Sequence, residues 1–122
     1  MIHFKIKEEI YDIPLVVIVG SWQDKCDYLQ NKYNIEQGNK QFFGGESVFF
    51  TDDGSSITAI WLPSFKYSEP YDIATLVHEI DHSVFRILEH VNIPILDNHS
   101  NHAYIYLKEY FLAKAFKKLK GV

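Results

Sequence analysis

The chain has 122 residues, of which 47% are hydrophobic, so it is long enough to bury one core and too short for two ordinary domains. Its formal net charge is -4, with acidic and basic residues spread along the chain, which argues against a general attraction to nucleic acid or to an anionic membrane surface. The longest apolar run, residues 13–20, is too short to span a bilayer. We therefore expect a single domain, residues 1–122, that binds neither nucleic acid nor membrane.

The first half of the chain predicts two strands, a helix and a loop. Residues 2–6 alternate between apolar and polar side chains, whereas residues 15–19 are apolar and mostly β-branched, so both are expected in a sheet. Ser21 is a good N-cap for a helix that runs to about Tyr33. Residues 34–46 lose this periodicity and contain three glycines, which indicates a loop.

A hairpin is expected next. The apolar segments 47–50 and 57–62 are separated by a polar stretch that contains Asp53 and Gly54, and glycine tolerates the positive φ that such turns require. Pro63 ends the second strand because proline cannot donate a ladder hydrogen bond.

Two helices complete the prediction. Asp72 is expected to cap a helix that runs to about residues 90–91, and a last helix is expected from about residues 100–101 to Lys120. The predicted fold class is therefore α+β, with a small mixed β-sheet packed on helices.

The helix that begins at Asp72 carries two histidines away from its apolar stripe. Because a helix turns about 100° per residue, His78 and His82 project on one side, a single turn apart. Two imidazoles in this arrangement can direct both Nε2 atoms at one zinc ion. The apolar stripe on the other side consists of Ile73, Val77, Ile80, Val84, Ile87 and Val91.

Glu79 completes an HExxH motif. It lies about 100° around the helix from His78, so its carboxylate can reach a water on the metal without competing for the metal. A motif this short arises by chance in about 2% of chains of this composition, so a third metal ligand is needed as an independent signal.

Five residues after the motif are candidates for that third ligand. Glu89 lies about 10 Å further along the helix than His82, which is too far to bind the same ion. His102 is favoured because a helix that returns antiparallel after a short loop would bring its first turn alongside the pair. Glu109 is the alternative on that helix, and Asp97 and His99 in the connection remain open.

These residues resemble the gluzincin metallopeptidases. The segment "HEIDH" is followed twenty positions later by "NHA", where gluzincins carry an Asn-Glu-Ala type motif whose glutamate binds zinc. The "WLP" strand and the segment "HAYIYLKEY" also resemble small, phage-encoded zinc metallopeptidase-like proteins. The resemblance covers about residues 46–112 and implies a zincin-like fold, with the HExxH helix followed by a C-terminal helix.

The chain departs from that pattern at two positions. His102 stands where the family has its glutamate, which preserves ligation because imidazole is a good zinc donor. Tyr106 stands where thermolysin-like enzymes place an aspartate that orients a zinc-bound histidine. Tyr106 and Tyr104 are candidates for orienting a ligand or for stabilising an oxyanion.

The resemblance implies a peptidase with one zinc ion per chain. His78, His82 and His102 would hold the zinc, and Glu79 would take a proton from the zinc-bound water and pass it to the leaving amine. No other cofactor is expected. A peptide or protein substrate is expected to add as a strand along residues 57–62, taken here as a sheet edge.

A second function remains open, a non-catalytic structural or accessory module, possibly phage-derived, in which zinc holds two helices together. A structural zinc has four protein ligands, so Asp97 or His99 would close such a site. The single cysteine, Cys26, cannot form an internal disulfide, which favours a reducing compartment. We expect a cytoplasmic protein, in the host cytoplasm or the virion if it is phage-encoded.

Overall fold

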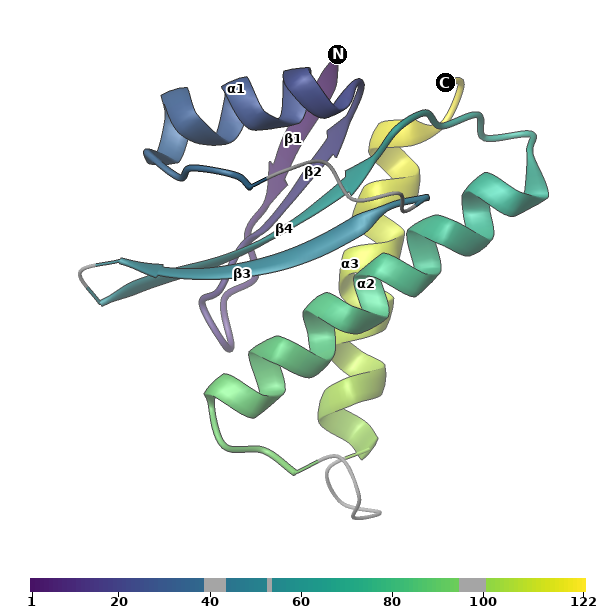
Figure 1. Cartoon of the computed structure of the whole chain (residues 1–122). Helices are drawn as coiled ribbons and strands as arrows, with labels where there is room; N and C mark the ends of the chain where they lie inside the picture. The colour runs from purple at the N-terminus through teal and green to yellow at the C-terminus, as the bar shows by residue number, and fades with distance from the viewer. Residues whose placement is uncertain (39–43, 53, 95–100) are drawn as a thin grey trace.

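The computed structural model describes residues 1–38, 44–52, 54–94 and 101–122 of the chain. These residues form four strands and three helices, shown in Figure 1. In chain order the elements are β1 (Ile2–Ile6), β2 (Leu15–Val19), α1 (Trp22–Tyr33), β3 (Glu46–Asp52), β4 (Ser55–Leu62), α2 (Pro70–His90) and α3 (Asn101–Leu119).

The strands form one mixed sheet in the order β1-β2-β4-β3. β1 pairs with β2 and β3 pairs with β4 in antiparallel fashion, whereas β2 and β4 are parallel, with Val17 opposite Ile60. The prediction that residues 57–62 form a sheet edge is therefore wrong. Those residues have β2 on one side, because the apolar β2 needs a neighbour on both of its edges, and β3 on the other, because β3 and β4 form a hairpin. Among the described residues, β1 and β3 are the edge strands, and β3 is the one next to β4.

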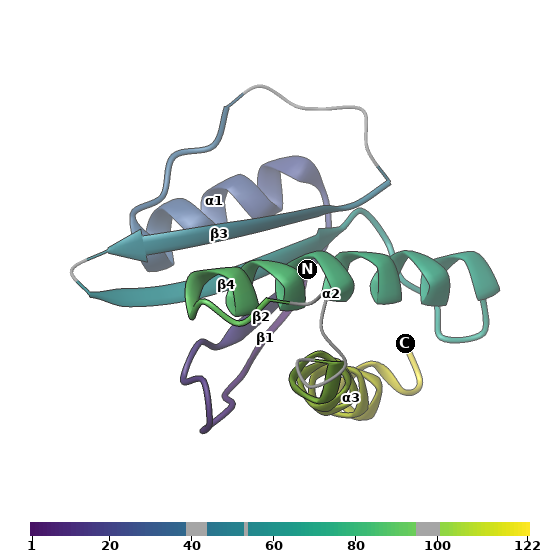
Figure 2. The same ribbon diagram turned by 90° about the horizontal axis from the view of Figure 1, so that it is seen from below.

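The helices lie on both faces of the sheet. α1 covers one face, and α2 and α3 pack on the other, as Figures 1 and 2 show from two directions. The prediction of an α+β fold with a small mixed sheet packed on helices is confirmed. Because successive residues of a strand point to opposite faces, an apolar strand such as β2 buries side chains under both layers.

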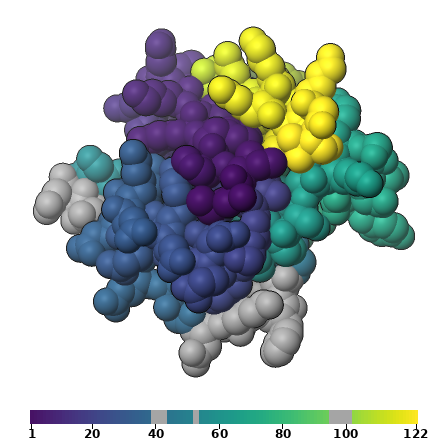
Figure 3. Space-filling view, turned by 90° about the horizontal axis from the view of Figure 1, so that it is seen from above, coloured from purple at the N-terminus to yellow at the C-terminus, as the bar shows by residue number. Residues whose placement is uncertain are grey.

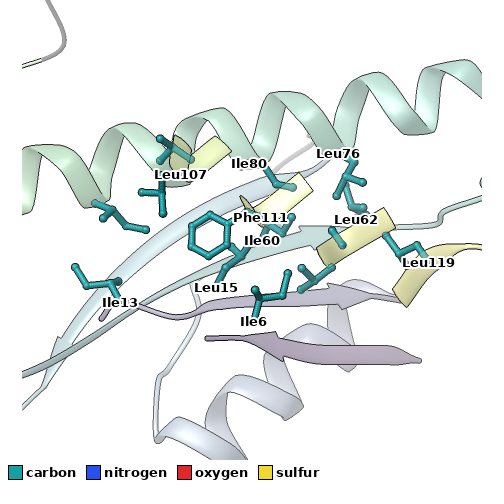
Figure 4. Close-up of a cluster of buried hydrophobic side chains, with 14 of the residues drawn as sticks. Ile6, Ile13, Leu15, Ile60, Leu62, Leu76, Ile80, Leu107, Phe111 and Leu119 are labelled. Carbon is teal, nitrogen blue, oxygen red and sulfur yellow. The ribbon is translucent and has the colours of Figure 1, made fainter. Parts of the chain in front are cut away.

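Two hydrophobic clusters follow from this layering. The larger one fills the space between the sheet and α2 and α3, where Ile60, Ile80 and Phe111 are fully buried (Figure 4). The smaller one lies under α1 and is built around Ile18 and Leu29. The larger cluster fixes the position of α2 against β3 and β4, and so it also fixes the side of α2 that faces away from the core.

The predicted helix boundaries agree with the structure, except at the start of α2. Ser21 caps α1, and its hydroxyl accepts from the backbone N–H of Asp24 at 3.0 Å. α2 begins two residues before the predicted Asp72, with Glu69 as N-cap and Pro70 in the first turn. Proline suits that turn because no helical partner is lost there. Asp72 instead accepts a hydrogen bond from the backbone N–H of Lys66.

The predicted hairpin is formed by β3 and β4, and Gly54 in its turn has a φ of 80°. Asp53, the other predicted turn residue, lies outside the described residues. At the end of the chain, the carbonyl of Val122 accepts a hydrogen bond from the backbone N–H of Tyr67, so the C-terminus lies against the segment that precedes α2. Figure 3 shows the C-terminal residues (yellow) next to this teal segment. Among the described residues, no helix is both long and apolar enough to cross a membrane.

Candidate metal centre

His78 and His82 of α2 converge as the sequence predicts. Their Nε2 atoms lie 3.1 Å apart, with ring centroids 4.6 Å apart and ring planes at 84° to each other. Two nitrogens that bind one tetrahedral zinc with bonds of about 2.1 Å are about 3.4 Å apart, so this pair needs little adjustment to bind an ion. Both side chains are exposed, which leaves an ion free access to them.

Glu79 lies beside the pair but inside the protein. Its side chain is only 5% exposed, and one carboxylate oxygen lies within 4.8 Å of the ligand nitrogens of His78 and His82. Burial raises the pKa of this carboxyl, the two histidines lower it, and the Glu46 carboxylate raises it, with burial the largest effect. A carboxylate with a raised pKa accepts a proton more readily, which suits a general base.

An open cavity of about 630 Å³ lies in front of these three residues. One wall is the outer side of α2, from Tyr71 to Arg86, and the other is the segment 44–47 that leads into β3. Among the described residues, none that lines the cavity comes from α3. The wall opposite α2 is therefore the start of the edge strand, where the sequence predicts a loop through residue 46.

Gly45 brings this segment directly against the candidate base. A Cβ atom at Gly45 would lie 3.0 Å from Oε2 of Glu79 and 3.1 Å from the carbonyl oxygen of Trp61. Such contacts are tighter than nine in ten of those that real Cβ atoms make, so glycine is the residue that fits between Glu79 and β4 without a shift of its neighbours. The close approach contributes to the burial of the Glu79 carboxylate.

A buried lysine holds the next residue of that wall. Lys25 on α1 is 1% exposed, and its Nζ lies 2.5 Å from Oε1 of Glu46. The ammonium group also lies 3.8 Å from the ring centroid of Trp22 and 5.7 Å from that of Trp61, as in a cation–π contact. Glu46 is thus tied to the helix on the opposite face of the sheet.

Side-chain contacts align β3 with α2. The hydroxyls of Ser47 and Ser83 lie 2.8 Å apart, and Thr58 donates to Ser83 at 2.7 Å. Further along, the rings of Phe49 and His90 have centroids 5.1 Å apart. Higher residue numbers on β3 thus meet higher residue numbers on α2, so the edge strand and the helix run in the same direction past the cavity.

His102, the favoured third ligand, is exposed in the first turn of α3, and its ring is not part of the group formed by His78, Glu79 and His82. The first turn of α3 nevertheless lies beside the part of α2 that carries His82. The ring of Tyr104 stacks on Phe85 with centroids 5.1 Å apart, and its hydroxyl donates to Asp81 at 2.8 Å. Ligation by His102 therefore stays a prediction.

The remaining predicted residues are placed as follows. Glu109 is exposed and, like His102, lies outside the histidine group. Asp97 and His99 lie outside the described residues. The hydroxyl of Tyr106 donates to Glu8, after β1, at 2.9 Å, so it is bonded away from the histidine group, and its role at the metal centre stays a prediction. Tyr110, four residues later on α3, donates to the carbonyl of Lys7. Residues four apart share one side of a helix, so Tyr106 and Tyr110 both face β1 rather than α2.

Sequence reasoning missed several residues of the cavity wall, among them Gly45, Glu46 and Arg86. The first two fall in the predicted loop, and no local pattern shows that the loop returns to the motif helix. For Arg86 the sequence does contain a feature that could have identified it. It is the only arginine of the chain and lies four residues after His82, on the same side of the helix.

The assignment of His102 predicts how two alanine variants bind zinc. His102→Ala is expected to weaken zinc binding by at least tenfold, because two histidines alone make an incomplete site, whereas Glu109→Ala should bind like the wild type. Zinc affinity measured by competition with a chelating dye under identical conditions tests this. The opposite order of the two variants would assign the third ligand to Glu109.

No protein-family model, curated protein or solved structure matches the chain. The likeness to gluzincins accordingly rests on the quoted motif residues, and the case for a metal centre rests on the geometry of His78, Glu79 and His82.

Proposed function

We propose that the protein is a zinc-dependent peptidase in which Glu79 assists the attack of a zinc-bound water on a peptide bond. The observation that carries this proposal is the pair of converging Nε2 atoms, 3.1 Å apart, with the buried carboxylate of Glu79 beside them at an open cavity. A zinc staple between helices requires no such carboxylate, whereas hydrolysis requires a base within reach of the water.

The residues divide the chemistry between them. His78 and His82 would hold the zinc together with a third ligand, for which His102 is our candidate. When bound, zinc lowers the pKa of its water and polarises the substrate carbonyl. The carboxylate of Glu79 accepts the proton of the attacking water and donates it to the departing amine. Its burial keeps this proton transfer away from bulk water.

The free edge of β3 supplies a place for the substrate backbone. Within the described residues β3 pairs with β4 on one side only, and its start forms the cavity wall opposite the histidines. An extended peptide that pairs with this edge forms main-chain hydrogen bonds without regard to its side chains. This strand takes the role that the sequence assigned to residues 57–62.

The first test is metal content. We expect about one zinc ion per purified chain and a lower melting temperature after chelation, since a ligand bound only by the native state stabilises it. The matched control is the His78→Ala, His82→Ala double variant, whose melting temperature should not respond to the chelator. A wild-type protein that binds zinc no better than this double variant would overturn the metal site.

The second test is hydrolysis itself. The zinc-loaded protein is incubated with a random decapeptide library, and new termini are counted by mass spectrometry. Cleavage that a chelator stops and added zinc restores is the expected result. Zinc binding without any cleavage would instead favour the non-catalytic module.

A further inference from the structure

Arg86 extends the line of functional side chains on α2. It lies one turn beyond His82, it is exposed, and it lines the same cavity as the histidines and Glu79. Among the described residues, the ion pairs join Lys25 to Glu46 and Lys108 to Asp81, so no carboxylate in the described part of the chain lies within 4.0 Å of the guanidinium.

The charges around the cavity leave Arg86 available to a ligand. The charged residues other than histidine in its described lining are Glu46, Glu79 and Arg86. Glu46 is neutralised by Lys25, and Glu79 is the proposed base. The guanidinium is therefore the one cation that this lining offers to an incoming substrate. Its planar, fork-shaped donors match the two oxygens of a carboxylate, the anionic group that a peptide carries on its acidic side chains.

The direction of the edge strand says which part of a peptide meets Arg86. β3 and α2 run the same way, with Gly45 against Glu79, Ser47 against Ser83 and Phe49 against His90. A peptide that pairs with β3 in antiparallel fashion, the slightly more stable mode, runs the opposite way. Residues on the N-terminal side of the cleaved bond would then lie toward Arg86.

The spacing along α2 indicates which substrate residue would meet Arg86. Arg86 is four residues, or about 6 Å, beyond His82 along the helix axis. An extended peptide advances about 3.3 Å per residue, so this distance corresponds to about two residues of substrate.

We propose that Arg86 selects substrates with an acidic side chain about two residues to the N-terminal side of the cleaved bond. This inference rests on the proposed peptidase function, and it adds a substrate class to it. Arg86 acts on binding and specificity, whereas the proton transfer belongs to Glu79.

The test compares wild type, Arg86→Gln and Arg86→Lys on matched peptides. A cleaved sequence from the decapeptide library is synthesised with Glu, Gln or Lys at the second position before the cut. For the wild type we expect a kcat/KM about tenfold higher with Glu than with Gln, because a guanidinium left without its carboxylate binds the amide poorly. The Glu-to-Gln ratio should fall to near one in Arg86→Gln and be partly kept in Arg86→Lys.

A charge reversal adds a readout that a purely structural role of Arg86 would not move. Arg86→Glu should prefer the Lys peptide over the Glu peptide. Equal Glu-to-Gln ratios in wild type and Arg86→Gln, or no reversal in Arg86→Glu, would overturn the inference even if the peptide is cleaved well.

Binding measurements separate this inference from the peptidase proposal. Binding is measured by fluorescence anisotropy on Glu79→Gln with and without the Arg86→Gln change. The ligands are the same three peptides, labelled, together with a set in which Glu is fixed at each position in turn. A Glu preference that depends on Arg86 supports the anionic subsite even if the wild type cleaves nothing. If no Glu-containing peptide binds better than its Gln counterpart, the inference is wrong.

Discussion

Glu79→Gln is expected to abolish peptide hydrolysis while the protein keeps its zinc. Glutamine preserves the shape of the side chain but cannot accept the proton of the water, and loss of a general base costs about 10²- to 10⁴-fold in rate. The measurement is kcat on a cleaved peptide alongside zinc content. Hydrolysis at the wild-type rate would remove Glu79 from the mechanism.

The matched control for this change is Glu89→Gln. Glu89 is on the same helix and loses the same charge, but it is exposed and does not line the cavity of the metal centre. We expect Glu89→Gln to keep both zinc and activity. A comparable loss of activity in Glu89→Gln would point to a general effect of the charge of α2.

Glu79→Gln is expected to stabilise the zinc-free protein at neutral pH, although it removes the activity. Burial raises the pKa of Glu79, so the folded state favours the protonated form, and ionisation costs folding free energy. This cost is absent below the ordinary glutamate pKa of about 4.3, grows as the pH rises toward the folded-state pKa, and is constant above it. Without zinc, Glu79→Gln should therefore be more stable than wild type at pH 7 and equally stable at acid pH. Urea unfolding at both pH values measures this, and a wild type that is the more stable protein at pH 7 would contradict it.

Lys25→Met is expected to destabilise the protein by about 3 kcal/mol, the cost of leaving a poorly exposed charge without its partner. Methionine fills much of the space of the lysine stem, so the loss reports on the charge rather than on packing. The charge left behind is the carboxylate of Glu46, which is 16% exposed. Urea unfolding compares the two proteins at pH 7 in the presence of saturating zinc.

A double variant isolates the ion pair in this prediction. Lys25→Met combined with Glu46→Gln removes both charges, so it should recover at least half of the lost stability. If Lys25→Met costs less than about 1 kcal/mol, or if the double variant is no more stable than the single one, the pair does not hold the cavity wall.

The sequence by itself determined the local features of this protein. The strands at residues 2–6 and 15–19, the Ser21 cap and the apolar stripe of α2 all depend on neighbours within a few positions, and the structure has them where the sequence places them. The convergence of His78 and His82 belongs to the same class, because one turn of helix brings their rings together whatever packs around it.

The tertiary structure alone decided what surrounds the motif. Local periodicity shows that β4 is buried but not that β2 and β3 flank it, so the edge strand was misplaced. In the same way, the sequence around Lys25 is that of a surface lysine. In the structure its ammonium group is enclosed by Trp22 and by two residues from distant parts of the chain, Glu46 and Trp61. The position of Tyr106 was set by Glu8, 98 residues away in sequence. Such contacts depend on which strands and helices pair across the fold, and that information is spread over the whole chain rather than carried by any one segment.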